Sequence, residues 1–177
     1  MPSTQSLSIE PLSAAAFAPY GHMLGDAMQW SEPAAVFSNP ATDFWRTHLF
    51  QPGAAGDTEI LWVNYRSRDL VVSTLEVHHL TQQAIVPLTG AVVHVVACSN
   101  AQGLPDLDTL KAFLIPQGLG ICMQPGCWHA SRVLGEQVTC LMLTRRSTTL
   151  DLVAHLNGTS AAQESAFSDI SALIVTG

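Results

Sequence analysis

Short apolar segments separated by turn residues dominate the middle of the chain. Most are rich in valine, isoleucine and leucine, and pairs such as Thr89-Gly90 and Pro125-Gly126 lie between them. The segments are E-I-L-W-V-N-Y, V-V-S-T-L-E-V, A-I-V, A-V-V-H-V-V-A-C, L-K-A-F-L-I, G-I-C-M and V-T-C-L-M-L-T. Many short strands at close, even spacing, without helical periods between them, predict an antiparallel barrel or sandwich.

The flanking segments have weaker patterns. Residues 8–21 predict a short strand and a brief helix that Ser13 caps. Residues 25–56 predict a long connection with some strand character. The end of the chain predicts a helix near 150–156 and then a strand at 169–175 that lies at a sheet edge or pairs with a second subunit. We expect one domain over residues 1–177, made of lead-in strands and a loop (1–56), the barrel core with the site (57–147) and a tail (148–177).

Composition narrows the possible partners. Apolar residues make up 47% of the chain and charged residues 12%, which is below the average of about 25% and predicts a large core or a buried subunit interface. The net charge is −7 and Lys111 is the only lysine, so a basic surface for nucleic acid is not expected. Signal-peptide and membrane-spanning patterns are missing, so we expect a cytoplasmic protein that does not bind membranes.

The cysteines and isolated histidines predict structural roles. The four cysteines form no C-x-x-C pair and lie in or beside apolar segments, which is typical of buried free thiols; they are Cys98, Cys122, Cys127 and Cys140. His94 lies between valines and is interpreted as a packed strand residue. We interpret His22, His48 and His155 as surface or loop residues.

A polar cluster interrupts the apolar pattern at residues 76–83, where a carboxylate, two imidazoles and two amides occur together. Glu76 and His78 are two positions apart, so on a strand their side chains lie on the same face. Gln83 would reach the same site only if the chain bends after His79. The pattern E-x-H-x4-Q-x6-G ends at Gly90. Taken alone, Glu76 and His78 could also be a plain hydrogen-bonded pair.

A second cluster, G-I-C-M-Q-P-G-C-W-H at residues 120–129, has a histidine shortly after a Pro-Gly turn. Together the two clusters resemble the two sequence motifs of the cupin superfamily, which are small antiparallel barrels with a metal in the mouth. The resemblance implies a double-stranded β-helix or jelly-roll barrel with a few short helices. Carried over position by position, it implies a divalent cation such as nickel, zinc or manganese held by Glu76, His78, Gln83 and His129.

Longer strings narrow the resemblance. L-S-x-x-A-F at 12–17, L-E-x-H-x4-Q-A-x-x-P-L-x-G at 75–90, P-D-L-x-T-L-x-A-F at 105–113 and W-H at 128–129 are similar to the ureidoglycolate lyase family. This resemblance implies a homodimer that releases urea and glyoxylate from (S)-ureidoglycolate in allantoin breakdown.

Several positions depart from that family's pattern. The family reads E-R-H-P where this chain has Glu76-Val77-His78-His79, and W-H-H-P where it has Trp128-His129-Ala130-Ser131. The family also has an aspartate at the position of Cys140 and D-R at the position of Arg145-Arg146. These differences leave the exact substrate open.

The resemblance implies a metal-assisted carbon–nitrogen lyase. In our hypothesis the cation chelates the substrate carboxylate and α-hydroxyl and lowers the hydroxyl pKa. His79 or Glu76 would act as the general acid or base.

Side chains beside the two clusters could bind the substrate. Arg66 and Arg68 precede the site strand and are either a carboxylate clamp or a solvated loop. Tyr65 and Trp128 would line the barrel mouth together with Trp62.

Two alternative functions stay open: a cupin isomerase or dioxygenase that acts on another small acid, and a cupin that binds such an acid without turnover.

Overall fold

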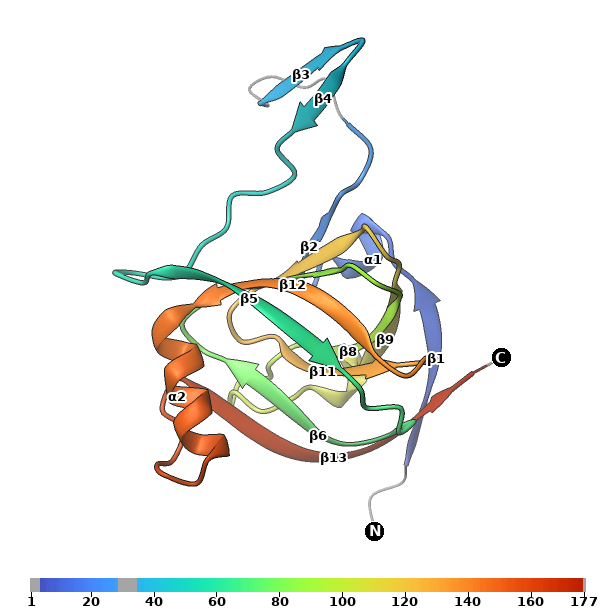
Figure 1. Ribbon diagram of the computed structural model, residues 1–177. Helices are drawn as coiled ribbons and strands as arrows, with labels where there is room; N and C mark the ends of the chain where they lie inside the picture. Colours follow the sequence, from blue (N-terminus) through green and yellow to red (C-terminus); the bar gives the residue numbers. More distant parts are fainter. Residues whose placement is uncertain (1–3, 29–34, 177) are drawn as a thin grey trace.

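The computed structural model describes residues 4–28 and 35–176, and strands predominate (Figure 1). The strands are β1 (Gln5–Pro11), β2 (Gly21–Leu24), β3 (Val36–Asn39), β4 (Thr42–Trp45), β5 (Thr58–Tyr65), β6 (Val71–His78), β7 (Gln83–Pro87), β8 (Val92–Ala97), β9 (Lys111–Ile115), β10 (Gly120–Met123), β11 (Trp128–Val133), β12 (Val138–Arg145) and β13 (Ser165–Val175). The helices are α1 (Ala14–Phe17), the 3-10 helix η1 (Leu107–Thr109) and α2 (Arg146–Leu156).

The strands form two main sheets. Strands β1, β13, β6, β11, β8 and β9 close into a barrel, and the order β2-β10-β7-β12-β5 forms a five-stranded sheet. Pairing is antiparallel except where β1 lies parallel to β13 and β9. This arrangement confirms the all-β, cupin-like barrel predicted from the sequence. No helix within residues 4–28 and 35–176 is long and apolar enough to cross a membrane.

Side-chain alternation in the strands follows from their places between layers. In β5 the odd-numbered positions from Glu59 to Tyr65 are half-buried and the intervening positions are exposed, as expected for a strand with one covered face. All six residues of β8 are buried, because Val93 and Val95 pack in one core cluster while Val92 and Val96 pack in the other. This burial on both faces explains why the β8 sequence is apolar at every position except His94.

The two core clusters are built from different sets of strands. One contains residues of the six barrel strands, including Leu75 and Trp128. The other contains residues of the five-stranded sheet, α1 and the adjacent faces of β8, β9 and β11; its centre is the aromatic group Phe17, Tyr20 and Phe113. The brief helix α1 begins where the sequence predicts, because the Ser13 side chain accepts a hydrogen bond from the Ala16 amide.

The tail takes a more central place than the sequence predicted. We expected the final strand to lie at a sheet edge or to pair with a second subunit. Instead β13 pairs with β6 on one side and β1 on the other, so it is an internal strand of the barrel. The exposed edges of the five-stranded sheet are β2 and β5. The predicted helix near 150–156 is present and begins earlier, at Arg146.

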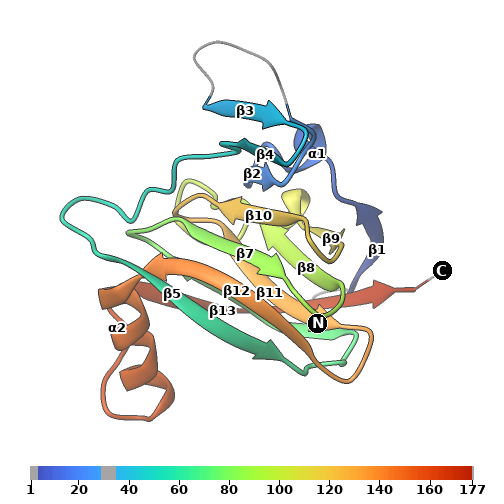
Figure 2. The same ribbon diagram turned by 45° about the horizontal axis from the view of Figure 1, so that its top comes forward.

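The β3–β4 hairpin extends beyond the β2 edge of the five-stranded sheet, and residues 46–57 lead from it to β5 (Figures 1 and 2). Phe37 and Phe44 stack on each other across it, with ring centroids 5.3 Å apart, and both side chains are exposed. The Trp45 indole donates a hydrogen bond to the Asp26 carbonyl near the base of the hairpin. A hairpin with strands of this length is marginally stable by itself.

Leu75→Ala should lower the free energy of unfolding by about 2–5 kcal/mol, because it leaves a cavity in the core shared by the barrel strands. Leu104→Ala is the matched control, since that side chain is exposed. Urea denaturation followed by circular dichroism measures both. A loss for Leu75→Ala no larger than that of the control would contradict the packing described above.

Candidate active site

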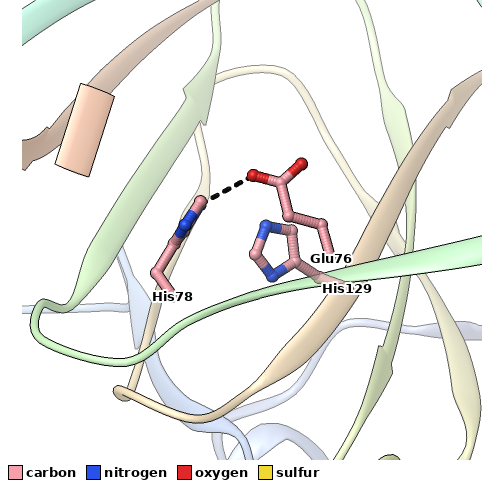
Figure 3. A group of neighbouring side chains, drawn as sticks. All are labelled: Glu76, His78 and His129. Carbon is pink, nitrogen blue, oxygen red and sulfur yellow. Dashed lines mark ion pairs between the residues drawn. The ribbon is translucent and has the colours of Figure 1, made fainter. Parts of the chain in front are cut away.

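The candidate ligands meet where β6 and β11 join. Glu76 of β6 is the direct antiparallel partner of His129 of β11, and His78 lies two residues further along β6, on the same face as Glu76. Figure 3 shows the three side chains converging on one point. One ligand atom from each lies within 4.8 Å of the others. Segments about fifty residues apart in the sequence therefore supply a single site.

The hydrogen bonds behind the imidazoles fix their orientation. His129 Nδ1 lies 3.0 Å from the Cys127 carbonyl oxygen, which can only accept, so Nδ1 carries a hydrogen and Nε2 is the nitrogen that could bind a cation. His78 Nδ1 lies 2.8 Å from the hydroxyl of Ser165 on β13. Such partners on the second ring nitrogen are typical of metal-binding histidines, because they set the tautomer and the ring direction.

The protonation of His78 decides whether its contact with Glu76 is an ion pair. His78 Nε2 lies 3.1 Å from Glu76 Oε1, a distance that makes an ion pair only if the ring is protonated. Burial, followed by the neighbouring His129 and His79, lowers the pKa of His78 to about 3. The ring is therefore neutral near pH 7, and its nitrogen is available to a cation.

The donor set fits a divalent cation. His78 Nε2 lies 3.0 Å from the Gln83 amide nitrogen and 3.1 Å from Glu76 Oε1. In one tautomer Nε2 donates to the carboxylate and Nδ1 accepts from Ser165; in the other Nδ1 donates to Ser165 and the lone pair of Nε2 can bind a cation. Two imidazoles and one carboxylate are a ligand combination that zinc, nickel and manganese accept.

These residues lie in a cavity of about 360 Å³ between the barrel and the five-stranded sheet. Its polar part includes Glu76, His78, Gln83 and His129, and its other wall comes from β5, β12 and α2. The lining residues are Leu61, Val63, Tyr65, Glu76, His78, Gln83, His129, Ala130, Ser131, Met142, Thr144, Thr148, Thr149, Leu152 and Leu156. Its size is within the range of small-molecule sites.

Of the aromatic residues predicted at the barrel mouth, Tyr65 lines the cavity and two do not. Trp62 is 66% exposed on the outer face of β5, because Leu61 and Val63 take the inward positions. Trp128 is 1% exposed and packs in the core of the barrel strands, because its neighbour His129 faces the cavity. Strand alternation places both tryptophans on the wrong face, so the expectation for them was wrong.

Of the two predicted proton carriers, Glu76 lines the cavity and His79 does not; the arginines of the possible carboxylate clamp also lie outside its lining. The His79 side chain is exposed, and its backbone amide donates a hydrogen bond to the Glu164 carbonyl. Arg66 and Arg68 are exposed as well, and Arg66 Nε donates to the Gln137 side chain at 2.7 Å. The structure thus places these three side chains away from the lining residues.

The positions that depart from the family pattern have different surroundings. Cys140 is fully buried in the core that includes Phe113. Arg145 donates hydrogen bonds to the carbonyls of Pro52 and Ala54, so it fastens the loop before β5. The described cysteines are free, and three of the four are buried.

Sequence reasoning missed the contribution of α2. Thr148, Thr149, Leu152 and Leu156 of this helix line the cavity. Their spacing of one, three or four residues places such side chains on one helix face, but nothing in the sequence tells which surface that face covers. The Thr148 hydroxyl donates to the Glu164 carboxylate, which ties the start of α2 to the segment before β13.

The sequence model of the ureidoglycolate lyase family matches residues 4–162. A ureidoglycolate lyase from Rhodobacter capsulatus is 32% identical over 127 residues, which are 71% of this chain and 76% of that protein. Another from Burkholderia mallei is 29% identical over 147 residues, 80% of this chain and 83% of that protein. A solved dTDP sugar isomerase from Desulfovibrio desulfuricans G20 shows a weak likeness, with 12% identity, a TM-score of 0.43 and coverage of 72% of this chain and 78% of that chain. The match over most of its length shows that this chain belongs to the ureidoglycolate lyase family.

Proposed function

We propose that this chain is a ureidoglycolate lyase that cleaves (S)-ureidoglycolate to glyoxylate and urea in allantoin degradation. The observation that carries the proposal is the convergence of Glu76, His78 and His129 in one cavity, in a chain of this family. The donor chemistry supports a divalent cation held by these three residues, with Gln83 beside them. When bound, such a cation would act as a Lewis acid and lower the pKa of the substrate's α-hydroxyl group.

The reaction needs one proton to move between two atoms of the substrate. The α-hydroxyl loses its proton and becomes the aldehyde oxygen of glyoxylate, the bond between carbon and the ureido nitrogen breaks, and that nitrogen gains a proton. Glu76 is the only carboxylate among the described lining residues. Its carboxylate has two oxygens, so one could hold the cation while the other accepts the hydroxyl proton and returns it to the departing urea; we assign Glu76 this second role as well.

The rest of the cavity supports this chemistry by binding and by excluding water. No lysine or arginine occurs among the described lining residues, and the Thr149 hydroxyl donates to the Arg145 carbonyl, so the Thr144 hydroxyl is the neutral donor proposed for the substrate carboxylate. Leu61, Met142 and Leu152 form an apolar wall that lowers the local dielectric constant and strengthens the polar contacts.

We also propose that the protein is a cytoplasmic homodimer that acts on a small molecule without nucleic acid or membrane. The outer face of the five-stranded sheet supports self-association, because Ile60 and Trp62 are 65% and 66% exposed. In the strand register Trp62 lies beside Leu141, and Leu141 beside Val86, so the three side chains form an apolar band across the sheet. A twofold pair could cover this band and the aromatic β3–β4 hairpin.

The wild-type protein should release urea from ureidoglycolate, and a chelator should abolish this release until a divalent metal is restored. His129→Ala should lower metal affinity and activity by at least about 10–100-fold, because it removes a ligand that the neighbouring strand supplies. Metal analysis and a urea assay measure both effects.

His79→Ala is the matched control, since His79 is exposed beside the site strand; it should keep its metal and most of its activity. Full metal content and full urea release in His129→Ala would refute the assigned site. Loss of activity in His79→Ala would return that residue to the role of proton carrier.

Trp62→Glu should convert the dimer into a monomer, because it places a charge in the apolar band. Leu104→Glu is the control, since Leu104 is exposed in the loop before η1. Sedimentation velocity at micromolar concentration distinguishes the two species. A monomeric wild-type protein, or a dimeric Trp62→Glu variant, would argue against this interface.

A further inference from the structure

Ser165 is a buried polar residue that contacts a proposed ligand but belongs to none of the sequence motifs. It is the first residue of β13 and lies directly opposite His78 in the antiparallel pairing of β13 with β6. The two residues are 5% and 4% exposed, and Ser165 Oγ lies 2.8 Å from His78 Nδ1. The family model matches residues 4–162, so the resemblance assigns no role to Ser165.

The two proposed histidine ligands are supported by different kinds of atom. Behind His129 lies the backbone carbonyl oxygen of Cys127, which only accepts hydrogen bonds. His129 Nδ1 therefore carries a hydrogen whether or not a cation is bound. Behind His78 lies a hydroxyl group, which can donate or accept. The neutral ring of His78 can therefore carry its hydrogen on either nitrogen and keep this bond.

The contacts of His78 Nε2 favour one tautomer in a site without a cation. Nε2 lies 3.1 Å from Glu76 Oε1 and 3.0 Å from the Gln83 amide nitrogen. With a hydrogen on Nε2 the ring donates to the carboxylate, and a hydrogen bond to a charged acceptor is about twice as strong as one between neutral groups. The Gln83 amide can turn end for end, so that its oxygen also faces this hydrogen. Nδ1 then has no hydrogen, and the Ser165 hydroxyl donates to it.

A bound cation requires the opposite tautomer. The cation binds through the lone pair of Nε2, so the ring hydrogen has to be on Nδ1. There the Ser165 oxygen accepts it, whereas a buried N–H group without an acceptor would weaken binding. One proton leaves Nε2 for the solvent and one proton from the solvent reaches Nδ1, so His78 stays neutral and takes up no net proton.

We propose that Ser165 is a positioning residue that lets His78 change its tautomer when a divalent cation binds. Its hydroxyl donates to Nδ1 in the cation-free site and accepts from Nδ1 in the occupied site. This inference rests on the proposed function, because it needs the cation, and it adds a residue that controls how the same site takes up its metal. His129 is set for the cation in advance, whereas His78 donates to Glu76 until the cation arrives.

Nitrogen NMR of histidine-labelled protein measures both tautomers without any substrate. In chelator-treated protein we expect His78 to carry its hydrogen on Nε2, and after zinc is added we expect it on Nδ1. His129 should carry a hydrogen on Nδ1 in both states. The signals that disappear in His78→Gln and His129→Gln identify these two rings among the seven histidines. A His78 hydrogen on Nδ1 in the chelator-treated protein would overturn the inference.

Zinc affinity, measured by competition with a chromogenic chelator, tests what the hydroxyl group contributes. Ser165→Ala should weaken zinc binding by about 10–100-fold, because the hydrogen on Nδ1 then has no acceptor. Ser165→Thr should restore most of the affinity, since it keeps the hydroxyl group. Ser168→Ala is the matched control and should bind zinc as the wild type does, because Ser168 lies on the same strand opposite Leu75.

The spectrum of Ser165→Ala separates a local effect from a loss of structure. Without zinc, this variant should still carry the His78 hydrogen on Nε2, because Glu76 still accepts it, whereas a misfolded protein would lose this signal. Wild-type zinc affinity in Ser165→Ala would contradict the positioning role.

The inference and the proposed function can fail separately. A wild-type protein that binds zinc but releases no urea refutes the lyase assignment, and the tautomers and zinc affinities still decide the role of Ser165. A protein that releases urea while His78 keeps one tautomer with and without zinc overturns the inference and leaves the lyase assignment intact. A protein that binds neither zinc, nickel nor manganese overturns the inference as well.

Discussion

The pairing of β6 with β11 is the contact on which the rest of the site depends. It sets Glu76 directly opposite His129, and it also closes the barrel between the two halves of its strand order. A carboxylate held in a largely buried site beside the neutral ring of His78 is costly without a compensating positive charge. The fold thus concentrates negative charge and lone pairs at the junction where its own strands meet, which is the environment a cation would stabilise.

Side-chain alternation explains which parts of this site the sequence could predict. Glu76 and His78 are two residues apart on one strand, so their common face follows from the period of a β-strand alone. The position of His129 beside them follows only from the resemblance to a two-motif barrel, because the pairing of β6 with β11 is a long-range contact. Trp62 and Tyr65 were both expected at the barrel mouth, but their positions differ by an odd number on β5, so they lie on opposite faces and only Tyr65 lines the cavity.

The tail could not be placed from its sequence. Its helix was recognisable, but neither its coverage of the cavity nor the support that Ser165 gives to His78 leaves a local signal. The prediction of an edge strand used the weak pattern at 169–175, and the parallel pairing of β13 with β1 was not anticipated. Contacts between distant segments are the part of a fold that periodicity and turn residues do not encode.

The parallel pairing of β1 with β13 also governs the order in which this protein can assemble. The first and last described strands are neighbours, with Gln5 opposite Ala172, so the barrel stays open until β13 has been synthesised. Until then the apolar side chains of β6 and β8 remain exposed to solvent. Pairings between strands far apart in the sequence also form slowly. Ser165 of β13 can orient His78 only after β13 has left the ribosome. A nascent chain therefore contains all the proposed metal ligands before the site can form.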